Sequence, residues 1–140
     1  MMEKGAAMET EAIGRRPRVL AIDDEPMLLR LISRTLDSCE VVPVADAREA
    51  LARIRGGERY DLILCDVSMQ GMNGMEFHRE LAQDEPGIAQ RVVFVTGGGL
   101  GTELQGFLGK VAGRVVQKPF DVKLLRSVVA DFLSAAPRLR

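Results

Sequence analysis

Five short apolar runs, separated by stretches with helical periodicity, constrain the fold of this chain most strongly. The runs lie at 19–22, 41–44, 62–65, 92–95 and 115–116. Apolar residues at successive positions are typical of parallel strands that are covered on both faces. Pro43 interrupts the second run and has no backbone N–H, so we expect this strand at or near an edge of the sheet.

Apolar residues recur at helical spacing between these runs. Helices are predicted after Pro26, after Asp46, around 75–83, near 102–108 and after Asp121. Gly56-Gly57 should end the second helix, and Pro86-Gly87 should stop the third. Seven of the 14 glycines lie within 97–113, so a helix there should be short and weakly stable. Strands alternating with helices predict an α/β fold: a doubly wound, five-stranded parallel sheet with helices on both faces.

The length of 140 residues fits one domain. We expect it to span residues 17–134, between a flexible N-terminal tail (1–16) and a C-terminal tail (135–140). The formal net charge of −1 argues against a dedicated nucleic-acid or anionic-membrane binder. No apolar run approaches the roughly 20 residues of a membrane span, and residues 1–18 lack the apolar core of a signal peptide. Two cysteines are too few for a disulfide framework, which favours a reducing, cytoplasmic location.

Polar residues with functional potential stand at the ends of four of the apolar runs. They are Asp23-Asp24, Asp66, Thr96 and Lys118, after the first, third, fourth and fifth runs. The carboxyl ends of parallel strands lie along one edge of a sheet, where such folds bind their ligands. Three carboxylates, one hydroxyl and one ammonium group are therefore expected to converge.

This set of groups has a coherent chemistry. Clustered carboxylates repel one another unless a cation joins them. An all-oxygen set with open positions suits Mg²⁺, which usually keeps several waters and takes one or two carboxylates plus a substrate phosphate. One carboxylate can then act as the nucleophile toward phosphorus, while the lysine and the hydroxyl neutralise charge on the phosphoryl oxygens.

At these residues the sequence resembles the receiver domain of two-component response regulators, the CheY-like fold. The resemblance covers about 18–133. It depends on an ordered set of motifs: Asp23-Asp24-Glu25, Asp66, Thr96 and Lys118-Pro119-Phe120. The separations of 42 residues from Asp24 to Asp66, then 30 to Thr96 and 22 to Lys118, also suit that family.

The resemblance implies a role for each of these residues. Asp66 would accept the phosphoryl group from a phosphohistidine. Asp24 and Asp66 would bind Mg²⁺, with Asp23 supporting through water and the backbone carbonyl of Ser68 as a further ligand. Lys118 would pair with the acceptor and then with the phosphate, and Thr96 would hydrogen-bond the phosphate. The Lys118-Pro119 peptide bond is expected to be cis.

Three positions depart from the family pattern. Gln70 stands where many members have a proline, so the loop after Asp66 is expected to be less rigid. Val115 stands where members usually have the tyrosine or phenylalanine that swings inward on activation, so the segment 97–113 is a candidate to carry that change instead. Gly97-Gly98 follow Thr96 and cannot shield a phosphate, so we expect an acyl phosphate that is open to hydrolysis or onward transfer.

The leading function is a phosphoacceptor signalling module rather than an enzyme. Its donor would be a histidine kinase or a histidine phosphotransfer protein, and its target a protein that binds the face of the fourth helix, fifth strand and last helix. The chain would be a single-domain regulator or the receiver of a larger or hybrid protein. An aspartyl-phosphate phosphatase is disfavoured because Ser68 stands where that chemistry usually has a second acid. A receiver-like module that needs no phosphate is the other alternative. His78, the only histidine, is assigned a surface or packing role.

Overall fold

The computed structural model describes residues 16–97, 102–111 and 114–135. The predicted tails, 1–16 and 135–140, fall almost wholly outside these residues. The elements follow one another as β1 (Arg18–Ile22), α2 (Pro26–Thr35), β2 (Glu40–Val44), α3 (Ala47–Arg55), β3 (Leu62–Asp66), α4 (Gly74–Asp84), α5 (Pro86–Ala89), β4 (Val92–Thr96), α6 (Thr102–Lys110), β5 (Val115–Gln117) and α7 (Val122–Ala135). Among the described helices, none is long and apolar enough to cross a membrane.

The five strands form one parallel sheet in the order β2-β1-β3-β4-β5. The chain moves from β1 to β2 on one side and then returns past β1 to β3, so the topology reverses between β1 and β3. Pro43 lies in the edge strand β2, opposite Ala21. The predicted fold class and the edge position of this strand are both confirmed.

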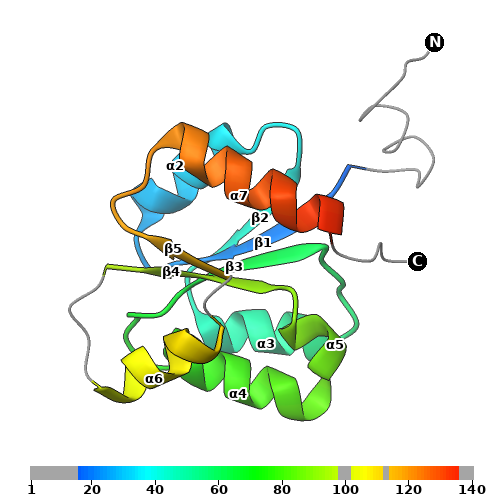
Figure 1. Ribbon diagram of the computed structural model, residues 1–140. Helices are drawn as coiled ribbons and strands as arrows, with labels where there is room; N and C mark the ends of the chain where they lie inside the picture. Colours follow the sequence, from blue (N-terminus) through cyan, green and yellow to red (C-terminus); the bar gives the residue numbers. More distant parts are fainter. Residues whose placement is uncertain (1–15, 98–101, 112–113, 136–140) are drawn as a thin grey trace.

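Helices cover both faces of the sheet, as the sequence predicts (Figure 1). The helices α2 and α7 lie on one face, and α3, α4, α5 and α6 lie on the other. The residues of β3 and β4 are buried along their whole length. This explains why their sequences are apolar at successive positions rather than at alternate ones.

The helix boundaries follow from local sequence signals. Asp46 caps α3 by accepting a hydrogen bond from the Arg48 backbone N–H, at 2.8 Å. Asp121 accepts one from the Leu124 backbone N–H at the start of α7, at 2.6 Å. The predicted stop at Pro86 is confirmed, because α4 ends at Asp84, and Pro86 then begins the four-residue α5, which was not predicted. Proline suits the first position of a helix, because the missing N–H has no partner there in any case.

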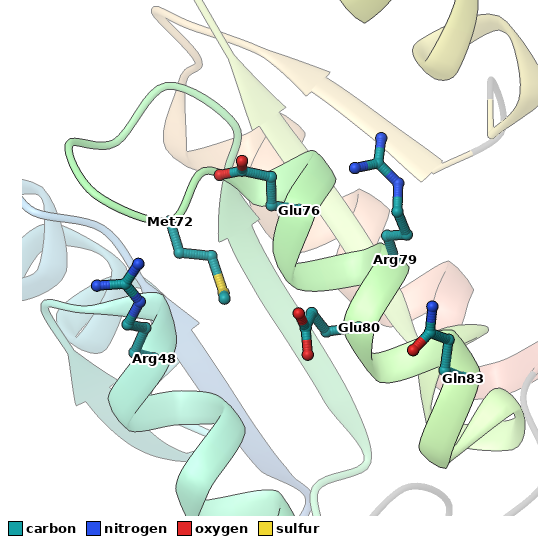
Figure 2. A pocket seen from close by; sticks show the side chains of 6 residues that line it. All are labelled: Arg48, Met72, Glu76, Arg79, Glu80 and Gln83. Atoms are coloured by element: carbon teal, nitrogen blue, oxygen red, sulfur yellow. The ribbon is translucent and has the colours of Figure 1, made fainter.

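Charged side chains join α3 to α4 on the surface. Arg55 of α3 contacts Glu80 at 3.0 Å and Asp84 at 2.6 Å, both on α4. Figure 2 shows a pocket beside these pairs, lined by Arg48, Met72, Glu76, Arg79, Glu80 and Gln83. Its charges are of both signs and project from the rim, so they do not converge on a point as a catalytic or ion-binding set would.

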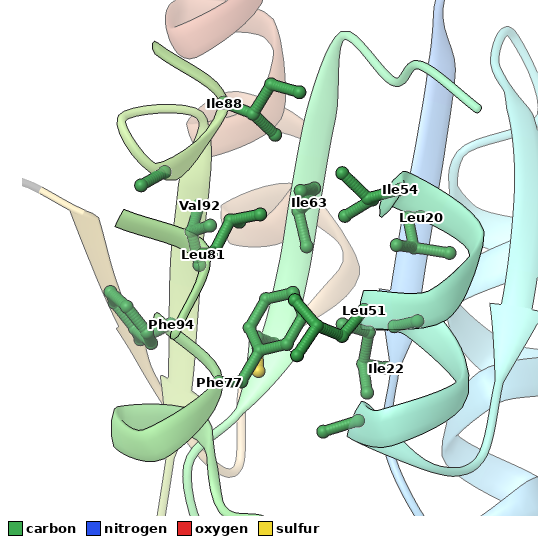
Figure 3. Packing of buried hydrophobic residues seen from close by; sticks show 14 of the residues in the cluster. Leu20, Ile22, Leu51, Ile54, Ile63, Phe77, Leu81, Ile88, Val92 and Phe94 are labelled. Carbon is green, nitrogen blue, oxygen red and sulfur yellow. The ribbon is translucent and has the colours of Figure 1, made fainter. Parts of the chain in front are cut away.

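Two hydrophobic cores fill the layers on either side of the sheet. Figure 3 shows the larger core, in which Phe77 and Leu81 of α4 pack toward Ile63 of β3 and the side chains of α3. The second core joins α2 and α7 to the opposite face through residues such as Ile32 and Leu125. Because both faces of the central strands are packed, the loops at their ends are held in fixed places at the edge of the sheet.

Candidate functional site

The strand register brings the predicted acidic residues together at one edge of the sheet. Ile22 of β1 lies opposite Cys65 of β3, so the next residue of each strand, Asp23 or Asp66, projects from the same edge. Carboxylate oxygens of Asp23, Asp24 and Asp66 all lie within 4.8 Å of one another. The predicted convergence of the three carboxylates is therefore present.

Two of these carboxylates are buried and the third is exposed. Asp23 and Asp66 are 2% and 3% exposed, whereas Asp24 faces solvent. Burial raises the pKa of Asp23, and the nearby charge of Asp66 raises it further. A hydrogen bond from the Glu25 backbone N–H, at 2.9 Å, and the charge of Lys118 oppose this rise. Ionised Asp23 and Asp66 side by side therefore carry an electrostatic cost that a bound cation would relieve.

Lys118 is the cation that the fold itself supplies. Its Nζ atom lies 3.3 Å from Asp23 Oδ2 and 3.4 Å from Asp66 Oδ2. Burial alone would lower the pKa of Lys118, but the charges of Asp66 and Asp23 outweigh that effect and raise it. The lysine is thus held protonated beside the predicted acceptor, where it can face a group with negative charge.

Backbone groups of the loop after β3 hold the acidic side chains in place. The Ser68 N–H donates to Asp66 Oδ1 at 3.1 Å, and the Gln70 N–H donates to Asp24 Oδ2 at 3.4 Å. The bond from Gln70 depends on a departure from the family pattern. A proline at position 70 would have no N–H to donate to Asp24. Gln70 therefore adds a link between this loop and Asp24.

Thr96 and Lys118 lie on neighbouring strand ends, as predicted. Thr96 is 2% exposed at the end of β4, and its carbonyl accepts a hydrogen bond from the Lys118 backbone N–H at 2.7 Å. The Lys118-Pro119 peptide bond is cis, which confirms the expectation from the resemblance. Gly97 follows Thr96 in an exposed position with no neighbour within 4 Å of where a Cβ would be. Gly98 lies outside the described residues.

Two contacts at this edge are not predictable from the strand-end pattern alone. Glu25 joins the cluster, with its Oε1 at 3.6 Å from Lys118 Nζ. Gly74 begins α4 so close to β3 that a Cβ there would lie 2.8 Å from the Asp66 carbonyl oxygen and 2.8 Å from Val67 Cα. The sequence signal for Gly74 is only its place beside the helix cap Asn73, which accepts from the Glu76 N–H at 2.8 Å.

The donor set fits a hard divalent cation. Asp23, Asp24 and Asp66 each offer a carboxylate oxygen, and two of them, Asp23 and Asp66, also face Lys118. Hard cations such as Mg²⁺ take oxygen ligands of this kind, whereas sites for softer metals contain cysteine or histidine. Cys65 precedes Asp66 but is fully buried in the core, and His78 packs elsewhere.

Comparison with known proteins agrees with this geometry. The family model for the response regulator receiver domain matches residues 19–130. The transcriptional regulatory protein TcrA of Mycobacterium tuberculosis is 32% identical over 107 residues, which cover 75% of this chain and 41% of TcrA. The sensor histidine kinase GacS of Pseudomonas protegens is 31% identical over 129 residues, 89% of this chain and 14% of GacS. The chain thus spans less than half the length of these relatives.

Solved structures give the same result. The signal receiver domain of a LuxO repressor protein from Vibrio parahaemolyticus has a TM-score of 0.75 and 25% identity, over 86% of this chain and 92% of that one. A CheY-like receiver domain protein from Methanospirillum hungatei has a TM-score of 0.74 and 26% identity, over 85% and 94%. The sheet order, the acidic cluster and the family match agree, and the chain belongs to the receiver-domain family of response regulators, the phosphoacceptor domains of two-component signalling.

Proposed function

We propose that this receiver domain accepts a phosphoryl group on Asp66 from a phosphohistidine of a histidine kinase or a histidine phosphotransfer protein. The observation that carries the proposal is the position of Asp66, buried at the end of β3 with Lys118 Nζ 3.4 Å from its Oδ2. Two further carboxylates, Asp23 and Asp24, complete an oxygen-rich site beside it. The relationship to a sensor histidine kinase supports a phosphohistidine donor.

In the proposed reaction an oxygen of Asp66 bonds to phosphorus while the bond from phosphorus to the donor nitrogen breaks. Lys118 stays protonated and faces the phosphoryl oxygens, where its charge offsets the charge that they carry in the transition state. The hydroxyl of Thr96, at the end of the neighbouring strand, hydrogen-bonds the phosphoryl group. The Ser68 N–H holds Asp66 through Oδ1, which limits the directions in which the carboxylate can turn. In this way the domain assists its own phosphorylation.

Mg²⁺ would be held by Asp24, Asp66 and the backbone carbonyl of Ser68, with Asp23 supporting through water. When bound, it supplies positive charge for the phosphoryl oxygens and relieves the repulsion among the carboxylates. The exposed Asp24 lies on the solvent side of this cluster. The pKa of Asp23 is raised by burial and by the charge of Asp66, so a cation nearby would favour its ionised form.

The surfaces beside the site suit protein partners. Met27 and Leu31 of α2 are 75% and 40% exposed, and Leu124 of α7 is 46% exposed. The helix α2 begins two residues after Asp24, and α7 begins four residues after Lys118. A donor domain that binds these apolar side chains can therefore reach Asp66. We assign the downstream protein target to the face of α6, β5 and α7, as the resemblance implies.

Intact mass after incubation with acetyl phosphate and Mg²⁺ tests the proposal. We expect one phosphoryl adduct, absent in Asp66→Asn and absent when a chelator removes the metal. Asp46→Asn is the matched control, because Asn also caps helices and residue 46 lies outside the carboxylate cluster. This variant should form the adduct like the natural chain.

Beryllofluoride with Mg²⁺, an acyl phosphate mimic, gives a second test that needs no phosphodonor. At a hundredfold excess over its dissociation constant it should stabilise the domain by about 2.7 kcal/mol, which raises Tm by roughly 10 °C in a domain of this size. If the natural chain shows neither the adduct nor this shift, the phosphoacceptor assignment is wrong. A receiver-like module that works without phosphate then takes its place.

A further inference from the structure

The only histidine of the chain lies in a cluster of three aromatic rings. His78 of α4, Phe94 of β4 and Phe107 of α6 meet pairwise, with ring centroids 5.1–5.5 Å apart and interplanar angles of 63–82°. All three pairs are edge-to-face, the arrangement that aromatic rings favour. The cluster therefore ties α6 to the central layer of the fold through Phe107, and Leu108 of the same helix packs against the same core.

The cluster lies on the same strand as the predicted phosphate contact. Phe94 and Thr96 are two residues apart in β4, so their side chains point to the same face of the sheet. Val115 of β5 is the register partner of Phe94. Phe107 and Val115 both pack against the core that contains Phe94. The aromatic ring that packs beside Phe94 is thus Phe107 of α6, while β5 contributes the small β-branched side chain of Val115.

Further contacts hold His78 in place. Its ring donates a hydrogen bond to the Ala89 carbonyl, which also accepts from Arg114 Nη1 at 3.0 Å. Arg114 Nη1 also reaches the Val92 carbonyl, at 3.1 Å. The histidine side of the cluster is therefore fixed to α4, to α5 and to the entry of β5. Phe107 belongs to a helix that carries Gly106 and Gly109, both exposed, and each glycine lowers the stability of a helix relative to alanine.

We propose that Phe107 couples the phosphoacceptor site to α6, through its contacts with Phe94 and His78. It would take the part that the resemblance assigns to an aromatic residue at position 115. When the Thr96 end of β4 shifts toward a phosphoryl group, Phe94 shifts with it, and Phe107 carries the displacement to α6. The inference rests on the proposed function, because it needs a phosphoryl group at Asp66.

The imidazole of His78 can report on the aromatic cluster by NMR. In an untagged chain, the imidazole C–H groups of His78 give the only histidine signals in a ¹H–¹³C spectrum, and the neighbouring phenyl rings set their chemical shift. We expect these signals to move when beryllofluoride and Mg²⁺ bind. Amide hydrogen exchange over Thr102–Lys110 should change at the same time, by on the order of fivefold or more.

Variants of Phe107 separate coupling from packing. Phe107→Leu should keep the beryllofluoride-induced rise in Tm but lose the change in exchange over α6, and Phe107→Tyr, which keeps the ring, should retain both. Phe132→Leu is the matched control, because Phe132 is also half-buried but packs in the core on the opposite face. It should respond like the natural chain.

The outcomes distinguish this inference from the function on which it rests. If beryllofluoride raises Tm but the His78 signals stay in place, the coupling role of Phe107 is wrong and the phosphoacceptor role stands. An undiminished change over α6 in Phe107→Leu overturns the inference in the same way. If beryllofluoride fails to raise Tm in the natural chain, the proposed function is wrong and the inference falls with it.

Discussion

Replacing Gly74 with alanine should destabilise the domain, although alanine is the better helix former. A Cβ at residue 74 would lie 2.8 Å from the Asp66 carbonyl oxygen, 2.8 Å from Val67 Cα and 3.3 Å from the Asp66 carbonyl carbon. All three are backbone atoms of the segment that holds the acceptor, so no side chain can rotate away to make room. The start of α4 and the end of β3 must separate instead.

The magnitude follows from two opposing effects. Overpacking of this kind costs about 1–3 kcal/mol, and the lower unfolded-state entropy of alanine offsets about 0.4–1 kcal/mol. We expect a net loss of about 1–2 kcal/mol in the free energy of unfolding. For a domain of this size, that loss lowers Tm by roughly 4–8 °C. Urea unfolding followed by circular dichroism measures the loss directly.

Gly106→Ala is the matched control, because nothing lies within 4 Å of its Cβ position in α6. There alanine should raise the free energy of unfolding by about 0.5–1 kcal/mol. Gly74→Ala should also weaken the beryllofluoride-induced stabilisation, since the Asp66 backbone moves, whereas Gly106→Ala should not. A Gly74→Ala protein as stable as the natural chain would refute the close approach of α4 to the acceptor strand.

Other outcomes follow from buried charge and buried thiols. In EDTA, Asp23→Asn should raise the free energy of unfolding, because burial and then the charge of Asp66 raise the pKa of Asp23; a Mg²⁺ titration should show weakened binding in the same variant. Burial, reinforced by the charge of Arg114, lowers the pKa of His78 from 6.5. The unfolded chain therefore binds this proton at a higher pH than the folded chain, and the free energy of unfolding should fall as pH drops through 6.5. His78→Gln should flatten that part of the urea-midpoint profile, and an unchanged slope would contradict this account. Cys39 and Cys65 are buried, and burial raises the pKa of each thiol, so neither should react with DTNB until urea unfolds the chain.

The strand ends were predictable because parallel topology leaves little freedom. Once the runs before Asp23, Asp66 and Lys118 are interpreted as parallel strands, their carboxyl ends must share an edge, and the distances of 3.3–3.4 Å from Lys118 to the two carboxylates agree. The helix cap at Asp46 and the edge position of Pro43 also follow from local rules. These features depend on residues that are adjacent in the chain or on the order of the strands.

Contacts between side chains of different elements were not predictable in this way. His78 was assigned a surface or packing role, and its half-buried ring packs against Phe94 and Phe107, but no spacing in the sequence indicates these two partners. Periodicity shows which face of one helix is buried, and it says nothing about which residue of another helix fills the space opposite. The predicted stop at Pro86 is confirmed, but the short helix α5 that begins there was not predicted, because proline both stops a helix and suits the first turn of the next.

The position of Pro43 has a consequence for how these domains behave at high concentration. An exposed edge strand offers free N–H and C=O groups to a strand from another molecule, which is a common route to aggregation. Here one edge strand, β2, contains a residue with no N–H at its fourth position, and the other, β5, is only three residues long. Neither edge is a good template for a further strand. We therefore expect little pairing of edge strands between molecules, so that contacts with partners fall to the helical surfaces instead.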